Sequence, residues 1–218
     1  MGSTTGLTDA QTLELYRVAL QNAGSNATIS ELMGELSYDQ ATIDEGKIWL
    51  TKARAAYDTN NKEDDETSQA YHDFSTLRGQ IKDQYSKHRK KAKVVFRKDA
   101  TTADLLDISG LVPKAYIKWL ESVKIFYTNA NDKPEILQKL ARLKITAEDI
   151  SAMVGQIEQL EAARSKYLLE KGESQDATNA KDQAMAEIDD WMSEFYAVAT
   201  IALEDKPQLL EVLGKVVK

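Results

Sequence analysis

The sequence has no cysteine and little proline, glycine or histidine. Its 218 residues include no Cys, 3 Pro, 10 Gly and 2 His. Without cysteine there is no disulfide framework, thiolate nucleophile, iron–sulfur cluster or cysteine-based zinc site. Two histidines are too few for a histidine-rich metal site within one chain. The sequence therefore excludes several classes of enzyme and metalloprotein, but it does not say what the protein does.

A surplus of positive charge and a long apolar run are also missing. The chain has 28 Lys and Arg against 35 Asp and Glu, a net charge of −7. This balance argues against a general nucleic-acid binder, which needs excess cations for phosphate contacts. No apolar run approaches the roughly 18–20 residues of a membrane span. Residues 1–6 are small and polar, unlike a signal peptide. We expect a cytoplasmic protein without a membrane span.

Abundant helix-forming residues predict an all-α fold, an antiparallel helical bundle. Apolar residues recur at helical spacing in four segments that we expect to be long helices: 39–59, 66–98, 146–171 and 176–204. Thr146 is the expected N-cap of the third, with Asp149 completing a capping box. Shorter helices are expected over 8–23, 28–36, 103–109, 113–129, 134–144 and 207–217, with Pro113 in a first turn. Breaks are expected at Asn60-Asn61 and Gly172–Ser174.

The order of these segments predicts an internal duplication, with one copy over 1–110 and the other over 111–218. A shift of 107 residues pairs Leu13 with Leu120, Ile29 with Ile136 and Ile43 with Ile150. A three-residue slip then pairs Tyr57 with Tyr167. The alternative is that amphipathic helices share Ala and Leu through composition alone. A duplicated chain would form two bundles in tandem or one merged bundle.

Charge favours the merged bundle. Residues 66–98 carry nine Lys or Arg and three acids, a net charge of +6. The equivalent residues 176–205 carry one Lys and eight acids, a net charge of −7. Opposite charges could set the pairing of the halves, although each surface pair contributes only about 0–1 kcal/mol. The alternative is that both faces are simply solvated.

A basic run and two tryptophans form the candidate interaction surface. Its members are Lys82, Lys87, Arg89, Lys90, Lys93, Arg97, Trp49 and Trp119. The basic residues could meet an acidic partner, RNA or anionic lipid, but the region has few aromatic residues for base stacking. The tryptophans lie on helices whose apolar faces are wide, which fits either an interface or packing on two sides within one bundle.

His88 is the single residue considered for cofactor binding. It shares a heptad series with Phe74, Ile81 and Val95, so its side chain could point into the core. It could act as a haem ligand or a pH switch. The alternative is a partly buried histidine capped by a neighbouring carboxylate or tyrosine, or one exposed at the rim of the bundle. We find no catalytic constellation, no Glu-x-x-His pair of a di-metal bundle and no phosphate-binding loop, and we expect no enzyme, metal or cofactor.

The second half of the sequence resembles a known family. The stretch Ala180–Phe195, which continues through Ile201–Gly214, is similar to a family of uncharacterised bacterial all-helical proteins. The resemblance is sharpest over 146–214 and weakest at Lys87–Lys98. It implies a helical bundle and no particular activity.

We therefore expect a non-catalytic structural or protein-interaction bundle, binding a protein partner or another copy of itself. The alternative is a bundle that holds haem or another small molecule between its two halves, near His88. Nucleic acid is not an expected partner.

Overall fold

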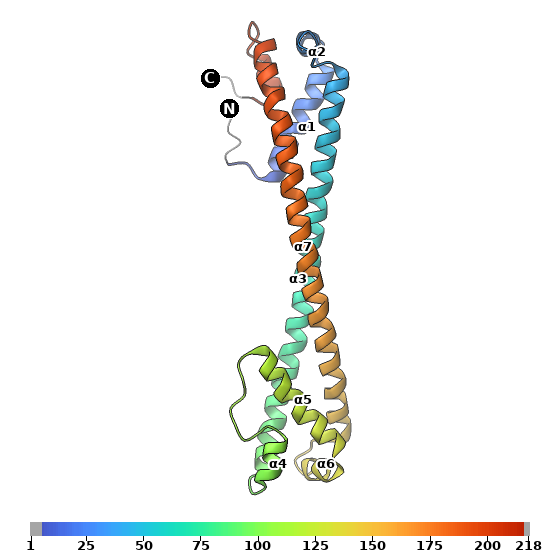
Figure 1. Cartoon of the computed structure of the whole chain (residues 1–218), viewed down its shortest axis with the longest axis vertical. Helices are drawn as coiled ribbons and strands as arrows, with labels where there is room; N and C mark the ends of the chain where they lie inside the picture. Colours follow the sequence, from blue (N-terminus) through green and yellow to red (C-terminus); the bar gives the residue numbers. More distant parts are fainter. Residues whose placement is uncertain (1–5, 216–218) are drawn as a thin grey trace. The chain divides into compact units, whose positions relative to one another are not determined.

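The computed structural model describes residues 6–215, and these residues form helices and no strand. The all-α prediction is confirmed. The helices are α1 (Asp9–Ser25), α2 (Ala27–Gly34), α3 (Gln40–Val95), α4 (Ala100–Leu105), α5 (Tyr116–Asp132), α6 (Pro134–Ala141), α7 (Ala147–Ala202) and α8 (Leu209–Val212) (Figure 1).

The helices α3 and α7 are much longer than the sequence predicts. Each is continuous over 56 residues, so the expected breaks at Asn60-Asn61 and Gly172–Ser174 are wrong. Asn and Gly within a helix cost only about 1 kcal/mol or less each. Asn60 is buried and its amide donates to Asp64 Oδ2 at 2.9 Å. Packing on either side of these positions outweighs their weak preference for turns.

Two predicted helix starts have different outcomes. Thr146 and Asp149 form the expected capping box, in which each side chain accepts from the other residue's backbone N–H, at 2.9 and 3.2 Å. The predicted start near Pro113 is wrong, because α5 begins at Tyr116 after an extended Ala115. Pro113 lies in the irregular segment before the helix, where its fixed φ suits extended backbone.

The contacts divide the chain into two compact units. Unit 1 contains the described residues up to Glu66 and those from Lys171 onward, and unit 2 contains Thr67–Glu170. In unit 1, α1, α2 and α8 join the first part of α3 and the last part of α7 (Figure 1). In unit 2, α4, α5 and α6 join the remaining parts of these two long helices. Each unit therefore contains pieces of both predicted copies, 1–110 and 111–218.

Each unit has its own hydrophobic core. The core of unit 1 includes Leu20, Ile29, Met33, Ile188, Phe195 and Leu203. The core of unit 2 includes Ile81, Tyr85, Phe96, Phe126, Tyr127, Leu140, Ile145 and Leu160. The oppositely charged segments expected to pair in a merged bundle fall mainly in different units, 67–98 in unit 2 and 176–205 in unit 1.

The elements recur after 107 residues. The helices α5, α6 and α7 begin 107 positions after α1, α2 and α3, and they have the same lengths of 17, 8 and 56 residues. Left-handed backbone recurs with the same spacing, at Ser37 and Lys144 (φ of 66° and 56°) and at Asp107 and Gly214 (φ of 51° and 76°). Elements of equal length thus occur in the same order 107 positions apart, and residues at this spacing can be compared between the two units.

Candidate functional site

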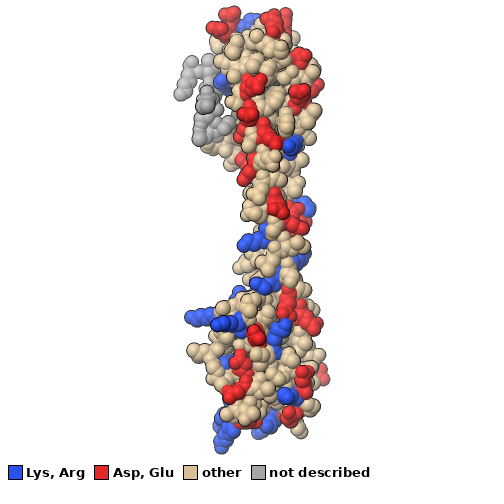
Figure 2. Space-filling view, viewed as in Figure 1, with Lys and Arg blue, Asp and Glu red and all other residues tan. Residues whose placement is uncertain are grey.

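The two units carry opposite net charges. Unit 2 has 18 Lys and Arg against 13 Asp and Glu, a net charge of +5, whereas the sequence segments assigned to unit 1 have 10 against 22, a net charge of −12. Figure 2 shows acidic residues over the visible face of unit 1, and Lys and Arg among acidic residues on unit 2. Although the net charge of the whole chain is −7, unit 2 is cationic and can attract anionic partners.

Five of the predicted surface cations are exposed in unit 2, four on α3 and Arg97 in the turn after its end. We call them the basic face: Lys82, Lys87, Lys90, Lys93 and Arg97. At 100° per residue the four lysines on α3 span about 140° of the helix circumference. All five are exposed, and none takes part in a salt bridge within residues 6–215. Unpaired cations on one side of a helix can meet a negatively charged surface.

Arg89 was also predicted to lie on this surface, but the structure buries it. The residue is 8% exposed. Its Nη2 donates to the backbone carbonyls of Ile108 at 3.1 Å and Gly110 at 2.5 Å. Helical spacing explains the difference, because Arg89 lies at the edge of the apolar stripe that contains Tyr85 and Ala92. Arg89 thus holds the segment after α4 against α3.

The segment that Arg89 holds ends in exposed apolar side chains. Leu111 is 96% exposed, and Val112 is also exposed. Lys93 of the basic face donates to the carbonyl of Gly110 at 3.4 Å, which places this apolar tip beside the cations. Leu111 and Val112 lie outside the surface predicted from the sequence. Their signal is the Leu-Val-Pro run that interrupts the helical pattern.

His88 is enclosed in the core of unit 2. It is 2% exposed, and burial lowers the pKa of the imidazole below 6.5. Its Nδ1 is 3.0 Å from the Tyr127 hydroxyl, and its Nε2 is 2.8 Å from the Gln84 amide nitrogen. This arrangement fits a neutral imidazole that accepts from Gln84 and donates to Tyr127. A haem iron could bind His88 only if one of these hydrogen bonds were broken.

An aromatic and cationic cluster surrounds Tyr116 at the start of α5. The guanidinium carbons of Arg78 and Arg164 lie 5.3 and 4.8 Å from the Tyr116 ring centroid. Trp119, predicted for the interaction surface, is 3% exposed and packs against Tyr116 at 5.9 Å between ring centroids. The indole therefore belongs to the core of unit 2 instead of an exposed patch, because the buried stripe of α5 is wide enough to include it.

A groove of about 430 Å³ opens beside this cluster. It is lined by Tyr116, Ile117, Leu120, Glu121, Lys124, Ile125, Glu161, Arg164 and Ser165. Burial raises the pKa of the Tyr116 hydroxyl, which stays protonated and can donate a hydrogen bond. The sequence does not predict the grouping of Arg78, Tyr116 and Arg164, because these residues come from three segments far apart in the chain.

Trp49 belongs to unit 1, whereas the residues of the basic face belong to unit 2. It is 37% exposed, and Lys52 Nζ lies 5.0 Å from its ring centroid. A shallow depression of about 450 Å³ beside it is lined by Lys47, Ile48, Thr51, Lys52 and Ala55. The structure thus assigns the predicted interaction residues to two units and buries two of them, Arg89 and Trp119.

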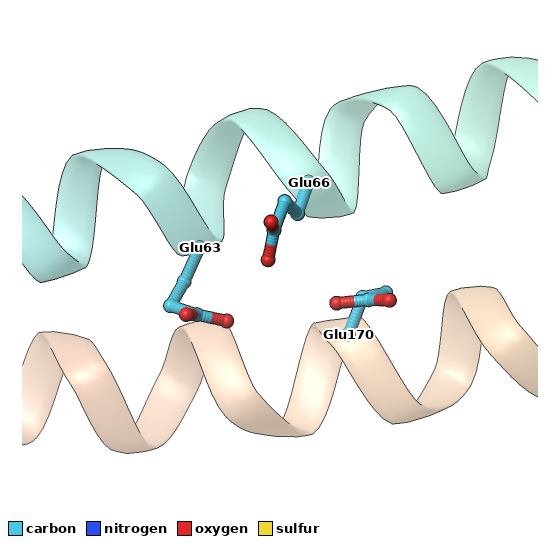
Figure 3. Close-up of side chains that lie close together, drawn as sticks. All are labelled: Glu63, Glu66 and Glu170. Carbon is cyan, nitrogen blue, oxygen red and sulfur yellow. The ribbon is translucent and has the colours of Figure 1, made fainter.

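Three glutamates lie near the division between the units. Figure 3 shows Glu63 and Glu66 on α3 and Glu170 on α7. Lys62 pairs with both carboxylates of α3, at 3.5 Å from Glu63 and 3.2 Å from Glu66. Glu170 belongs to the other unit. Because exposed acidic groups commonly lie together without an ion, we assign no metal site to them.

Comparison with protein-family models, curated proteins and solved structures finds no match. The resemblance of residues 146–214 to a bacterial family therefore stays a prediction. Within residues 6–215, no helix is apolar over a stretch long enough to cross a membrane.

Proposed function

We propose that the protein is a non-catalytic interaction protein that binds an acidic protein partner through unit 2. The observation that carries this proposal is the basic face beside the exposed apolar tip at Leu111 and Val112. Interfaces combine apolar contact with charges that select and orient the partner. A partner with a carboxylate-rich surface around an apolar depression would match both features.

We also infer that the scaffold arose by internal duplication and is an antiparallel bundle in each unit. The recurrence of helix lengths and left-handed residues after 107 positions supports duplication. In unit 1, Lys52 of α3 pairs with Glu187 of α7, and further along α3 Asp64 accepts from Ser174. The higher-numbered residue of α3 thus pairs with the lower-numbered residue of α7, which supports antiparallel packing of the two helices.

The duplication suggests a charge-reversed variant that should keep its fold. Lys82→Asp, Lys87→Glu and Arg97→Glu introduce the residues that stand at the equivalent positions 189, 194 and 204 of unit 1. We expect this triple variant to lose at least about tenfold in partner affinity, since each lost surface pair contributes about 0.2–1 kcal/mol and reversal adds repulsion.

The experiment begins with capture of partners by the wild-type chain and the triple variant, followed by calorimetric titration of the purified partner at low and high salt. A matched control reverses three exposed cations elsewhere in unit 2, at Lys118, Arg142 and Lys166. Tight binding to wild type and control, with loss in the triple variant and at high salt, supports the proposal. Equal binding by all three proteins contradicts it.

Sedimentation velocity of the purified chain distinguishes a second copy from another partner. The acidic unit 1 of one molecule could meet the basic unit 2 of another. Concentration-dependent association that disappears in the triple variant would make the partner this chain itself. If the chain is a monomer at every concentration, the partner is a different acidic protein, and the calorimetric titration tests whether it binds through the basic face.

A further inference from the structure

Two arginines of unit 2 that form no salt bridge lie against the ring of Tyr116. Tyr116 and Arg164 line the groove, and Arg78 lies against the same ring. The guanidinium carbon of Arg78 is 5.3 Å from the Tyr116 ring centroid and 5.7 Å from that of Trp119. The guanidinium carbon of Arg164 is 4.8 Å from the Tyr116 centroid. Attraction to the aromatic faces holds each cation in place, but the two positive charges repel each other.

Nearby carboxylates do not neutralise these arginines. Across residues 6–215, neither Arg78 nor Arg164 forms a salt bridge or a side-chain hydrogen bond. Glu161, one helical turn before Arg164, is paired with Lys124 at 2.9 Å. Glu121 also lines the groove and is exposed to solvent. Both guanidinium groups therefore keep their donors available to an anion.

The aromatic residues of the cluster also have unused donors. The Tyr116 hydroxyl and the Trp119 indole N–H are buried, and neither has a hydrogen-bond partner in the described part of the chain. Buried donors without partners are rare and cost free energy. Four donor groups thus gather around one ring.

The equivalent place in unit 1 has a carboxylate where unit 2 has the Tyr116 side chain. Counting back 107 positions, Asp9 stands in place of Tyr116, and its carboxylate pairs with Lys181 at 2.9 Å. The positions of Arg78 and Arg164 are taken by Met185 and Tyr57. In unit 1 the first residue of α1 therefore supplies a carboxylate that pairs with Lys181. In unit 2 the first residue of α5 is a tyrosine, and two arginines contact its ring.

We propose that this groove binds a small organic oxyanion, a carboxylate or phosphate attached to an apolar body. The oxyanion takes the charge position of the Asp9 carboxylate and accepts from Arg78 and Arg164. The apolar body packs along α5 on Ile117, Leu120 and Ile125, which line the same groove. This site is separate in its residues from the basic face and does not depend on a protein partner.

Fluorine NMR of the full chain labelled with 5-fluorotryptophan tests this proposal. Trp119 is the only tryptophan of unit 2, and Trp49 and Trp191 provide internal controls in unit 1. The probes are phenyl phosphate, benzoate and inorganic phosphate at constant ionic strength. We expect phenyl phosphate or benzoate to move the Trp119 signal saturably, with a Kd of about 1 mM or below, and to leave the other two signals in place.

Three variants introduce the residues of unit 1. Arg78→Met and Arg164→Tyr should each weaken binding at least about tenfold, because each removes a charge-assisted hydrogen bond. Tyr116→Asp should abolish binding by supplying an internal carboxylate. Lys118→Glu, on the same helix but outside the groove lining, is the control and should bind with little change.

The outcomes separate the parts of the proposal. Binding by wild type and control, with loss in the three variants, supports it. A Trp119 signal that does not move at about 10 mM probe, or that moves equally in the Arg78→Met/Arg164→Tyr double variant, overturns it. If inorganic phosphate binds as tightly as phenyl phosphate, the proposed contact of an apolar body with α5 is wrong. Unchanged Trp49 and Trp191 signals show that each variant keeps the fold of unit 1, and circular dichroism reports the helices of both units.

Discussion

At the scale of single residues, the buried imidazole of His88 makes the stability of unit 2 depend on pH. Burial lowers its pKa below 6.5, while nearby Lys91 and Lys87 oppose its charged form and Asp149 favours it. Above about pH 6.5 the imidazole is neutral in the folded and unfolded chain. Below that pH the unfolded chain binds the proton first, so acidification favours unfolding until the folded imidazole also titrates.

We predict that His88→Phe reduces the loss of stability between about pH 7 and pH 5, by about 1.4 kcal/mol for each unit of pKa difference removed. Phe195 occupies the equivalent buried position of unit 1, so the ring should fit. The variant should also lose about 1–3 kcal/mol at every pH, because the Tyr127 hydroxyl loses its partner.

Urea unfolding at several pH values measures both effects. Tyr127→Phe is the control, since it removes the same hydrogen bond but keeps the imidazole and its titration. An unchanged pH dependence in His88→Phe would show that other groups cause the acid sensitivity.

The sequence predicts part of this residue-scale arrangement. The heptad series of His88 predicts its burial, and Gln84 lies one helical turn away on the same helix. Tyr127 is 39 residues further along the chain, so its contact with His88 depends on how α5 packs against α3. The same reasoning applies to Arg89, whose carbonyl partners lie in an irregular segment that the helical pattern does not describe.

At the scale of elements, two glycines of α3 should respond oppositely to substitution. A Cβ at Gly46 would meet the Trp191 ring, with Cζ3 only 2.6 Å away, whereas a Cβ at Gly79 would meet nothing within 4 Å. We predict that Gly46→Ala destabilises the protein by about 1–3 kcal/mol through overpacking. Gly79→Ala should stabilise it by about 0.5–1 kcal/mol through helix propensity.

Thermal unfolding of the two variants measures the difference, and Trp191 fluorescence reports the displaced ring in Gly46→Ala. Because both substitutions add the same methyl group to the same helix, propensity cancels in the comparison. Equal effects at the two positions would argue against close packing of Gly46 on Trp191.

Helix type and most helix ends follow from sequence pattern at this scale. The capping box of Thr146 and Asp149 is local, and it is confirmed. The continuity of α3 and α7 is not local, since Asn60 and Gly172 carry the same turn preference in any context. Only the packing on both sides decides that the helices continue through them.

At the scale of the whole molecule, folding should follow the compact units instead of the repeated copies. Residues 67–170 contain the complete core of unit 2, whereas the fragment 1–110 contains only part of each core. We predict that the fragment 67–170 unfolds cooperatively, with a stability on the order of 5 kcal/mol. The fragment 1–110 should show no cooperative transition, because it lacks Ile188 and Phe195 of unit 1.

Circular dichroism with urea or heat measures these transitions. Mixing fragments 1–110 and 111–218 is a control, since together they supply every piece of both units. Cooperative unfolding of 1–110 alone, with none in 67–170, would contradict the division into these units.

The recurrence after 107 residues is visible in the sequence, but the composition of the units is not. The helix bounds recur with the same shift of 107 that pairs Leu13 with Leu120 and Ile29 with Ile136, whereas the three-residue slip expected near Tyr57 has no counterpart in these bounds. The predicted pairing of sequence positions relates α3 to α7 as whole helices. It contains no information on which part of each helix joins which core, and therefore did not predict the two opposite net charges.

The division of the chain into units also determines the order in which the residues of each core become available during translation. Residues 67–170 emerge as one continuous stretch, so unit 2 can close while later codons are still being read. The residues up to Glu66 emerge earlier but must wait for Lys171 and beyond before unit 1 is complete. Unit 1 is thus begun first and completed last, and we expect the apolar faces of α1 and α2 to stay accessible to chaperones during that interval.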